Sequence, residues 1–152
     1  VAEAMADHDA LFGGEESGGF SVRGHVREKD GVLMALLAAD ATDAEPFDDR
    51  VDRLLAEHGH IAAGKVSIEC PDDRKAGVLD ALEDHIPEAV AGHPVAEVVT
   101  LDGFKLLLEN GSWLLVRPSG TEPKLRVYAE SDADDRVETL LAAGRELVEP
   151  LG

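Results

Sequence analysis

Two dipeptides, Asp102-Gly103 and Asn110-Gly111, constrain the fold of this chain more than any other feature. Each lies between runs of residues typical of β-strands, and both are strong signals for a two-residue hairpin turn. A run of strands joined by such turns must pair in antiparallel fashion. The sequence therefore predicts three consecutive antiparallel strands, over residues 95–101, 104–109 and 112–116.

Further elements surround these strands. Apolar periodicity predicts helices over 47–58, 72–86 and 132–149, the last one capped by Ser131. Additional strands are expected at 65–70 and 125–130, and the core side of the latter is formed by Leu125, Val127 and Ala129. This order predicts an α+β domain in which helices pack on one face of a mostly antiparallel sheet.

The segment before residue 46 has a different character. The first eight residues are typical of the last turns of a helix, and another helix is expected over residues 28–43. Pro46 closes a plausible linker. We therefore predict two parts, the C-terminal portion of one domain over residues 1–45 and a compact domain over 46–152.

The chain is strongly acidic, and this limits its partners. It has 32 acidic residues against 14 basic ones and a formal net charge of −18. Such a charge argues against non-specific binding to nucleic acid or to anionic membranes. The acids are spread along the chain, lysines are few and alanines abundant, which favours a halophilic protein in a salt-rich cytoplasm. An ordinary acidic protein is the alternative.

Nothing in the sequence suggests a membrane or an oxidising compartment. The longest strongly apolar run, residues 32–39, is far shorter than the ~20 residues of a membrane span. The single cysteine, Cys70, cannot form an internal disulfide and continues the alternation of Val66 and Ile68. We expect a buried thiol in a soluble, cytoplasmic protein.

The segment from Arg117 to Arg126, R-P-S-G-T-E-P-K-L-R, is dense in hydrogen-bond donors and lies between two expected strands. An arginine can bind two phosphate oxygens at once, and the hydroxyls of Ser119 and Thr121 could reach a third. Gly120 would let the main chain approach a ligand closely. The residues therefore indicate a phosphate clamp. The alternative is a polar loop whose hydroxyls satisfy its own turn.

A second polar loop, G-G-E-E-S-G-G-F over residues 13–20, presents Glu15, Glu16 and Ser17 between glycines. Carboxylates accept hydrogen bonds from neighbouring hydroxyls of a sugar, so this loop is a candidate for sugar recognition. A metal site and a solvated acidic turn are the alternatives. Lys29 is expected near a helix start, where a cation is unfavourable unless an anion also binds there. A merely solubilising lysine is the other interpretation.

Three segments together resemble one family: G-G-E-E-S-G-G-F, G-H-V-R-E-K-D-G and R-P-S-G-T-E-P-K-L-R-V-Y. Their order and spacing are similar to those of the α-D-phosphohexomutase superfamily, in particular phosphoglucomutase/phosphomannomutase, along essentially the whole chain. The resemblance implies that residues 1–45 end the third of four domains, a fragment of an α/β domain. Residues 46–152 would be the fourth, a TATA-box-binding-protein-like domain.

The resemblance also implies roles for individual residues. Glu15 and Ser17 match positions that bind sugar hydroxyls, and Lys29 matches a lysine near the reacting phosphate. The positions matching the loop that holds the non-transferred phosphate are Arg117, Ser119, Gly120, Thr121 and Arg126. Some bacterial members have a histidine at the position of Gly19, so a histidine contact to phosphate is not carried over.

Other parts of the family pattern do not occur in this sequence. The family's phosphoserine lies in a T-A-S-H-N-P-type loop and its Mg²⁺ is bound by a D-G-D-G-D-R-type loop, and neither string is present. We therefore assign no metal ligand here, and we expect both loops in N-terminal domains of the same enzyme. On its own this chain is expected to be inactive.

The implied reaction moves a phosphoryl group between O1 and O6 of a hexose phosphate, with a hexose 1,6-bisphosphate as intermediate. The polar loops would bind opposite ends of this substrate. The doubled glutamate favours glucose or mannose phosphate, and a phosphoglucosamine mutase remains possible. The alternatives of another class are a stand-alone sugar-phosphate-binding module without catalysis and, against the charge, a nucleic-acid-binding domain.

Overall fold

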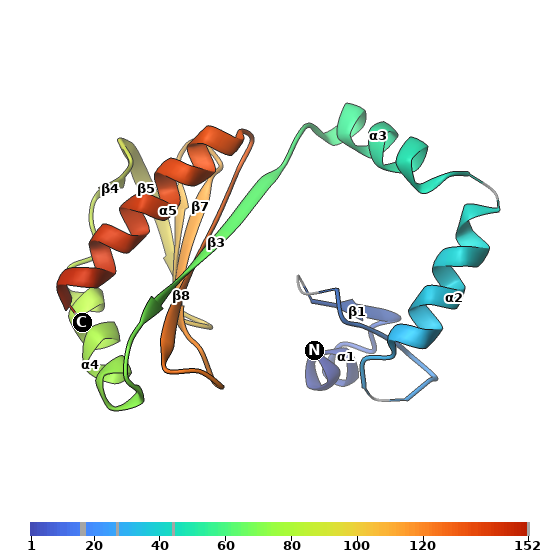
Figure 1. The fold of residues 1–152 in the computed structure, drawn as a ribbon, viewed down its shortest axis with the longest axis horizontal. Helices are drawn as coiled ribbons and strands as arrows, with labels where there is room; N and C mark the ends of the chain where they lie inside the picture. Colours follow the sequence, from blue (N-terminus) through green and yellow to red (C-terminus); the bar gives the residue numbers. More distant parts are fainter. Residues whose placement is uncertain (16–17, 27, 44, 152) are drawn as a thin grey trace. The chain divides into compact units, whose positions relative to one another are not determined.

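A computed structural model describes residues 1–15, 18–26, 28–43 and 45–151 of the chain (Figure 1). It divides into two compact units, Val1–Leu54 and Leu55–Gly152. The division falls inside a helix, whereas the expected domain boundary lies at residues 45 and 46. The assignment of that helix to either domain therefore stays a prediction.

The described residues of the first unit form one hairpin, two helices and the first part of a third. Phe12 and Phe20 stack across the hairpin with their ring centroids 5.3 Å apart. The Asp30 side chain accepts hydrogen bonds from the amides of Val32 and Leu33, both at 3.0 Å, and so caps a helix. The elements are α1 (Ala2–Asp7), β1 (Phe12–Gly14), β2 (Phe20–Val22), α2 (Gly31–Thr42) and α3 (Phe47–His58), which continues past the end of the unit.

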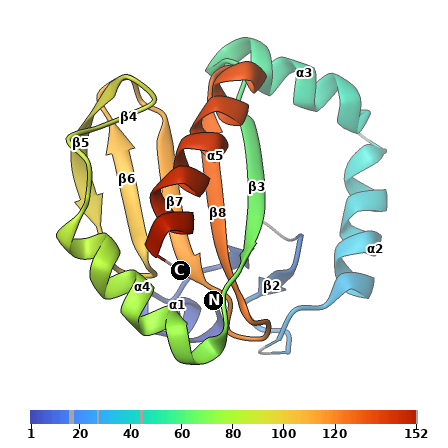
Figure 2. The same ribbon diagram turned by 60° about the vertical axis from the view of Figure 1, so that its left-hand side comes forward.

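The second unit is an antiparallel sheet with helices on one face, as predicted (Figure 2). The order of its strands across the sheet is β3-β8-β7-β6-β5-β4. Its elements are β3 (Ala62–Glu69), α4 (Asp72–Asp84), β4 (Ala89–Val90), β5 (His93–Val99), β6 (Phe104–Leu108), β7 (Trp113–Pro118), β8 (Lys124–Ser131), α5 (Asp134–Val148) and the short 3₁₀ helix η1 (Glu149–Leu151).

The core lies between the sheet and helices α4 and α5. The predicted core side of β8 is confirmed, since Leu125, Val127 and Ala129 are almost completely buried. Helix α5 contributes Val137 and Leu140 to the same core. Because side chains alternate across a strand, the residues of β8 in between, from Lys124 to Glu130, point to the face without helices. That face carries the polar groups described below.

The predicted lengths of both hairpin loops need correction. Residues 109–111 form a three-residue hairpin loop, because the Leu108 amide bonds to the Ser112 carbonyl and the Gly111 amide bonds to the Leu108 carbonyl, both at 2.9 Å. Gly111 has a φ of 84°, typical of that loop type. The other hairpin is longer still, since Val99 pairs with Lys105.

Ser131 does not cap the last helix. Its hydroxyl lies 2.9 Å from that of Ser112 in the sheet, and the residue at the N-cap of α5 is Ala133. The strands β2 and β4 were not predicted, because they are only three and two residues long, too short to establish a period. Cys70 follows β3 directly and is buried as expected.

Candidate functional site

The loop between β7 and β8 begins and ends in a regular antiparallel ladder. Pro118 pairs with Leu125, and the amide of Ser119 donates to the carbonyl of Lys124 at 2.9 Å. The loop tip is short and its Gly120 is exposed, with open space where a Cβ would be. A ligand can therefore approach the main chain of this tip without a side chain in the way.

Ser119 stabilises the turn from inside. Its Oγ accepts hydrogen bonds from the amides of Thr121, at 3.5 Å, and Glu122, at 3.2 Å, and the residue is only 5% exposed. The Thr121 side chain, in contrast, is exposed. In this structure the Ser119 hydroxyl thus serves the loop's own turn, as the alternative interpretation of these hydroxyls foresaw.

Arg117 and Arg126 are directly opposite each other on β7 and β8. Like charges at facing positions of two strands repel and destabilise the pairing. Both side chains are about one-third exposed, so part of this repulsion is screened by solvent. Two facing guanidiniums at the end of a ladder are the arrangement expected for a site that binds an anion.

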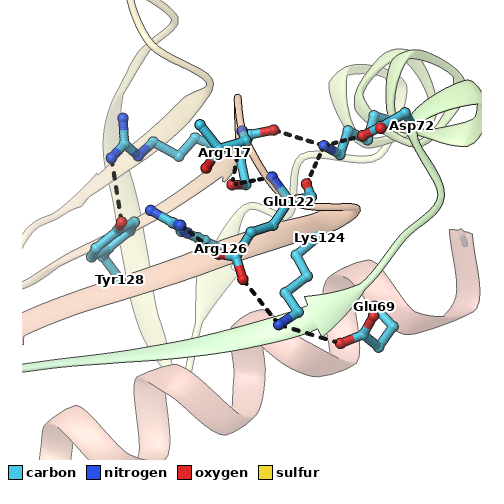
Figure 3. Close-up of polar contacts among 10 residues, drawn as sticks. Glu69, Asp72, Arg117, Glu122, Lys124, Arg126 and Tyr128 are labelled. Atoms are coloured by element: carbon cyan, nitrogen blue, oxygen red, sulfur yellow. Dashed lines mark hydrogen bonds and ion pairs between the residues drawn. The ribbon is translucent and has the colours of Figure 1, made fainter.

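Carboxylates accompany both arginines. Arg117 Nη1 lies 2.7 Å from Asp102 Oδ2. Arg126 Nη2 lies 2.7 Å from Glu122 Oε2, and both of these residues are drawn in Figure 3. Hydrogen bonds from Arg126 and from Lys124, the latter at 3.3 Å, hold the pKa of Glu122 below its ordinary range. The carboxylate of Glu122 is therefore ionised while it is paired with the Arg126 guanidinium.

Tyr128, which was not predicted from the sequence, lies against both arginines. Its hydroxyl accepts a hydrogen bond from Arg117 Nη2 at 3.3 Å, and the Arg117 guanidinium lies 5.3 Å from the ring centroid. Burial raises the pKa of the Tyr128 phenol, but the guanidiniums of Arg117 and Arg126 outweigh it, so the pKa lies below its usual value. Tyr128 is two residues after Arg126 on the same strand, so both side chains lie on the open face, and strand alternation could have identified Tyr128 from the sequence.

Lys75 was also missed, and it holds the loop from helix α4. Its Nζ lies 2.6 Å from each of three oxygens, the carbonyls of Ser119 and Glu122 and Oδ1 of Asp72. An ammonium group has three donors, so this set uses all of them. The side chain is only 12% exposed. No local pattern predicts a contact that joins residues 44 and 47 positions apart.

The first unit brings two other predicted residues together. Lys29 Nζ lies 2.9 Å from Glu15 Oε2, and the hydrogen bond with this carboxylate raises the pKa of Lys29. The amide of Glu15 bonds to the carbonyl of Gly19 at 2.9 Å, which closes the bend. A Cβ on Gly19 would meet the Lys29 side chain at 2.4 Å, so this glycine leaves room for the lysine. Glu16 and Ser17 lie outside the described residues.

The described residues contain neither a metal-binding cluster nor a membrane-spanning helix. No group of three or more His, Cys, Asp or Glu residues among them could hold a metal ion. No helix in the described ranges combines the length and the apolar character needed to cross a bilayer.

The chain is similar to known proteins along most of its length. Residues 1–58 match the phosphoglucomutase/phosphomannomutase α/β/α domain III, and residues 66–147 match the C-terminal domain of the same family. A probable phosphoglucosamine mutase of Methanothermobacter thermautotrophicus is 31% identical over 136 residues, which are 90% of this chain and 29% of the relative. A phosphopentomutase of Thermococcus kodakarensis is 41% identical over 109 residues, 72% of this chain and 23% of the relative.

Solved structures agree with this assignment at the level of the fold. A phosphoglucomutase/phosphomannomutase family protein of Burkholderia thailandensis superposes with a TM-score of 0.70 and 16% identity, over 99% of this chain and 30% of that one. Parafusin, a phosphoglucomutase of Paramecium, gives a TM-score of 0.63 and 18% identity, over 95% of this chain and 31% of that one. The chain thus spans less than a third of these relatives. It belongs to the phosphoglucomutase/phosphomannomutase family, of which it contains the C-terminal portion.

Proposed function

We propose that this chain is the part of a phosphohexomutase that binds the sugar hydroxyls and the non-transferred phosphate of a hexose phosphate. In the proposed reaction, a phosphoryl group moves between O1 and O6 of this hexose. One observation supports the proposal most: Arg117 and Arg126 are opposite each other in a chain whose net charge is −18. Facing cations at a loop of exposed main chain favour a phosphate over other ligands.

In this proposal the clamp recognises a phosphate without regard to which end of the sugar carries it. The two guanidiniums supply fixed positive charge, and the exposed main chain at Gly120 supplies an amide. A bisphosphate intermediate could then turn round and present its other phosphate to the same residues. Catalysis of phosphoryl transfer depends largely on such positioning.

Glu15, Ser17 and Lys29 would act at the sugar and at the reacting phosphate. Lys29 would meet the phosphate as a cation, since a lysine is protonated at neutral pH and the Glu15 carboxylate raises its pKa further. Glu15 would accept hydrogen bonds from sugar hydroxyls with its carboxylate oxygens. Phosphoserine and Mg²⁺ belong, in this proposal, to preceding domains of the same enzyme, and no step is assigned to them here.

Three hexose phosphates are candidates for the substrate. Several relatives are named phosphoglucosamine mutase, including those of Methanococcus maripaludis and Methanococcus aeolicus. Glucosamine phosphate is therefore a candidate beside glucose and mannose phosphate, which the two adjacent glutamates favour. Comparison of kcat/KM for the three phosphates in the full-length enzyme decides between them.

Phosphate binding by the chain itself tests the clamp. Titration with inorganic phosphate and glucose 6-phosphate, followed by NMR, should shift the amide signals of residues 119–124. Arg117→Ala should abolish these shifts. Arg136→Ala is the matched control, because Arg136 pairs with Asp132 at the start of α5. Equal shifts in both variants would remove Arg117 from the clamp.

Kinetics test the role within the enzyme. The chain alone should show no turnover of glucose 1-phosphate in a coupled assay. In the full-length enzyme, Arg117→Ala should raise KM roughly ten- to a hundredfold, the equivalent of one lost charged hydrogen-bond pair. A start codon directly before Val1, or turnover by the chain alone, would instead support an independent protein and contradict the proposal.

A further inference from the structure

The loop that would bind phosphate carries a carboxylate aimed at its own arginine. Glu122 Oε2 lies 2.7 Å from Arg126 Nη2, and Oε1 of the same residue lies 3.3 Å from Lys124 Nζ. Both are charge-assisted contacts of the kind that a phosphate oxygen would make. The side chain of Glu122 thus occupies a donor of Arg126, which the proposed function assigns to the ligand.

This contact is imposed by the main chain around Glu122. Its amide donates to Ser119 Oγ at 3.2 Å, and its carbonyl accepts hydrogen bonds from the Lys75 ammonium at 2.6 Å and from the Lys124 amide at 2.8 Å. With its amide and its carbonyl both held, the residue keeps its carboxylate near Arg126 at a high effective concentration. An exposed glutamate on an unrestrained chain would not have this advantage.

Charges around the loop are balanced before any ligand arrives. Arg117 has Asp102 as its partner in the same way that Arg126 has Glu122. A phosphate bound to Arg126 while the ionised Glu122 carboxylate is still in place would be strongly repelled by that carboxylate. The carboxylate must therefore leave Arg126 before phosphate can take its place.

We propose that Glu122 is an intramolecular competitor of phosphate, which the ligand displaces from Arg126 on binding. The inference rests on the proposed function of the loop. Its consequence is an affinity for phosphate lower than the two arginines alone would give. Such a competitor would favour release of the sugar phosphate after each turnover.

Glu122→Gln tests the inference, because glutamine keeps the shape of the side chain and removes its charge. The dissociation constant for inorganic phosphate, measured by calorimetry at fixed ionic strength, should fall by about two- to fivefold, the strength of one exposed ion pair. Glu149→Gln is the matched control: it removes an equal charge from the Arg145–Glu149 pair at the C-terminal end of α5. Its effect should stay within about twofold.

Glu122→Asp separates direct contact from a general charge effect. Aspartate keeps the charge but is one methylene shorter, so it should reach Arg126 poorly and bind phosphate more tightly than the unchanged chain. If only Glu122→Gln binds more tightly, the charge acts through space and the displacement is wrong. Equal or weaker binding by Glu122→Gln also overturns it. Absence of saturable binding by the unchanged chain would instead overturn the proposed function.

Discussion

Tyr128 is the only tyrosine of the chain, and it lies against the two arginines of the clamp. Its pKa is therefore expected below the ordinary value of about 10, and the ultraviolet absorbance of tyrosinate reports it without interference from other residues. Arg117→Gln removes a neighbouring positive charge and should raise this pKa. Arg136→Gln should leave it unchanged, and a pKa at or above the ordinary value in the unchanged chain would contradict the geometry.

The same titration reports occupancy of the clamp. Phosphate bound to Arg117 and Arg126 would neutralise the charges that favour tyrosinate, so the pKa of Tyr128 should rise as phosphate is added. Sodium chloride at equal ionic strength is the control for screening. A pKa that responds equally to both salts would mean that phosphate acts only as an electrolyte.

Gly103 is a second position where one residue decides local structure. Its φ is 97°, and a Cβ there would lie 2.3 Å from the carbonyl oxygen of Val116, the residue before Arg117. Gly103→Ala should therefore lower the free energy of unfolding by more than the about 1–2 kcal/mol that a positive φ costs alone. Urea unfolding followed by Trp113 fluorescence measures it.

Gly111→Ala provides the matched control for this substitution. Gly111 also has a positive φ, 84°, but nothing lies within 4 Å of its Cβ position. Gly111→Ala should therefore lower the free energy of unfolding only by the cost of a positive φ, without the added cost of a steric clash. Equal losses in the two variants would mean that the Val116 carbonyl moves aside at little cost.

At the scale of elements, helix α4 fixes the clamp loop through Lys75. Lys75→Met leaves the Ser119 and Glu122 carbonyls without their shared donor and should lower the free energy of unfolding by about 1.5–3 kcal/mol. The amides of Thr121 and Glu122 should exchange hydrogen faster, and phosphate should bind more weakly. Hydrogen exchange by NMR and calorimetry measure these effects separately.

Arg74→Met is the control, since Arg74 lies in the same turn of α4, is exposed and carries the same charge. It should leave exchange of the loop amides unchanged. If both variants weaken phosphate binding equally, Lys75 contributes only its charge and does not position the loop.

The elements of the second unit were largely predictable, and their connections were not. Strand alternation identified Leu125, Val127 and Ala129 as core, because one face of the sheet is buried. Turn dipeptides located both hairpins but not their lengths, since Asn-Gly is compatible with two- and three-residue loops. The contact of Lys75 with the loop escaped prediction because the loop atoms that it binds are main-chain carbonyls, which carry no sequence signal. Arg117 and Arg126 were found, but their direct opposition depends on register.

At the scale of the whole molecule, the surplus of negative charge should make stability depend on salt. Repulsion among 32 acidic residues destabilises the folded state at low ionic strength, and exposed ion pairs offset little of it. Raising KCl from about 0.1 M to about 2 M should therefore increase the unfolding midpoint of the second unit. Trp113, the only tryptophan, reports this unit alone.

Sucrose at matched osmolality separates screening from exclusion of cosolute from the surface. A midpoint that rises equally in sucrose, or that falls in KCl, would mean that surplus charge does not govern stability. It would also favour an ordinary acidic protein over one adapted to a salt-rich cytoplasm.

Because Arg117 and Arg126 face each other across two strands, their joint exposure on one face depends on the correct alignment of β7 and β8. A slip of β8 by one position would turn Arg126 towards the helices and Val127 towards solvent, so a misaligned sheet could not present both guanidiniums together. If the loop binds phosphate as proposed, a phosphate affinity column should therefore retain only those molecules whose sheet is assembled in register.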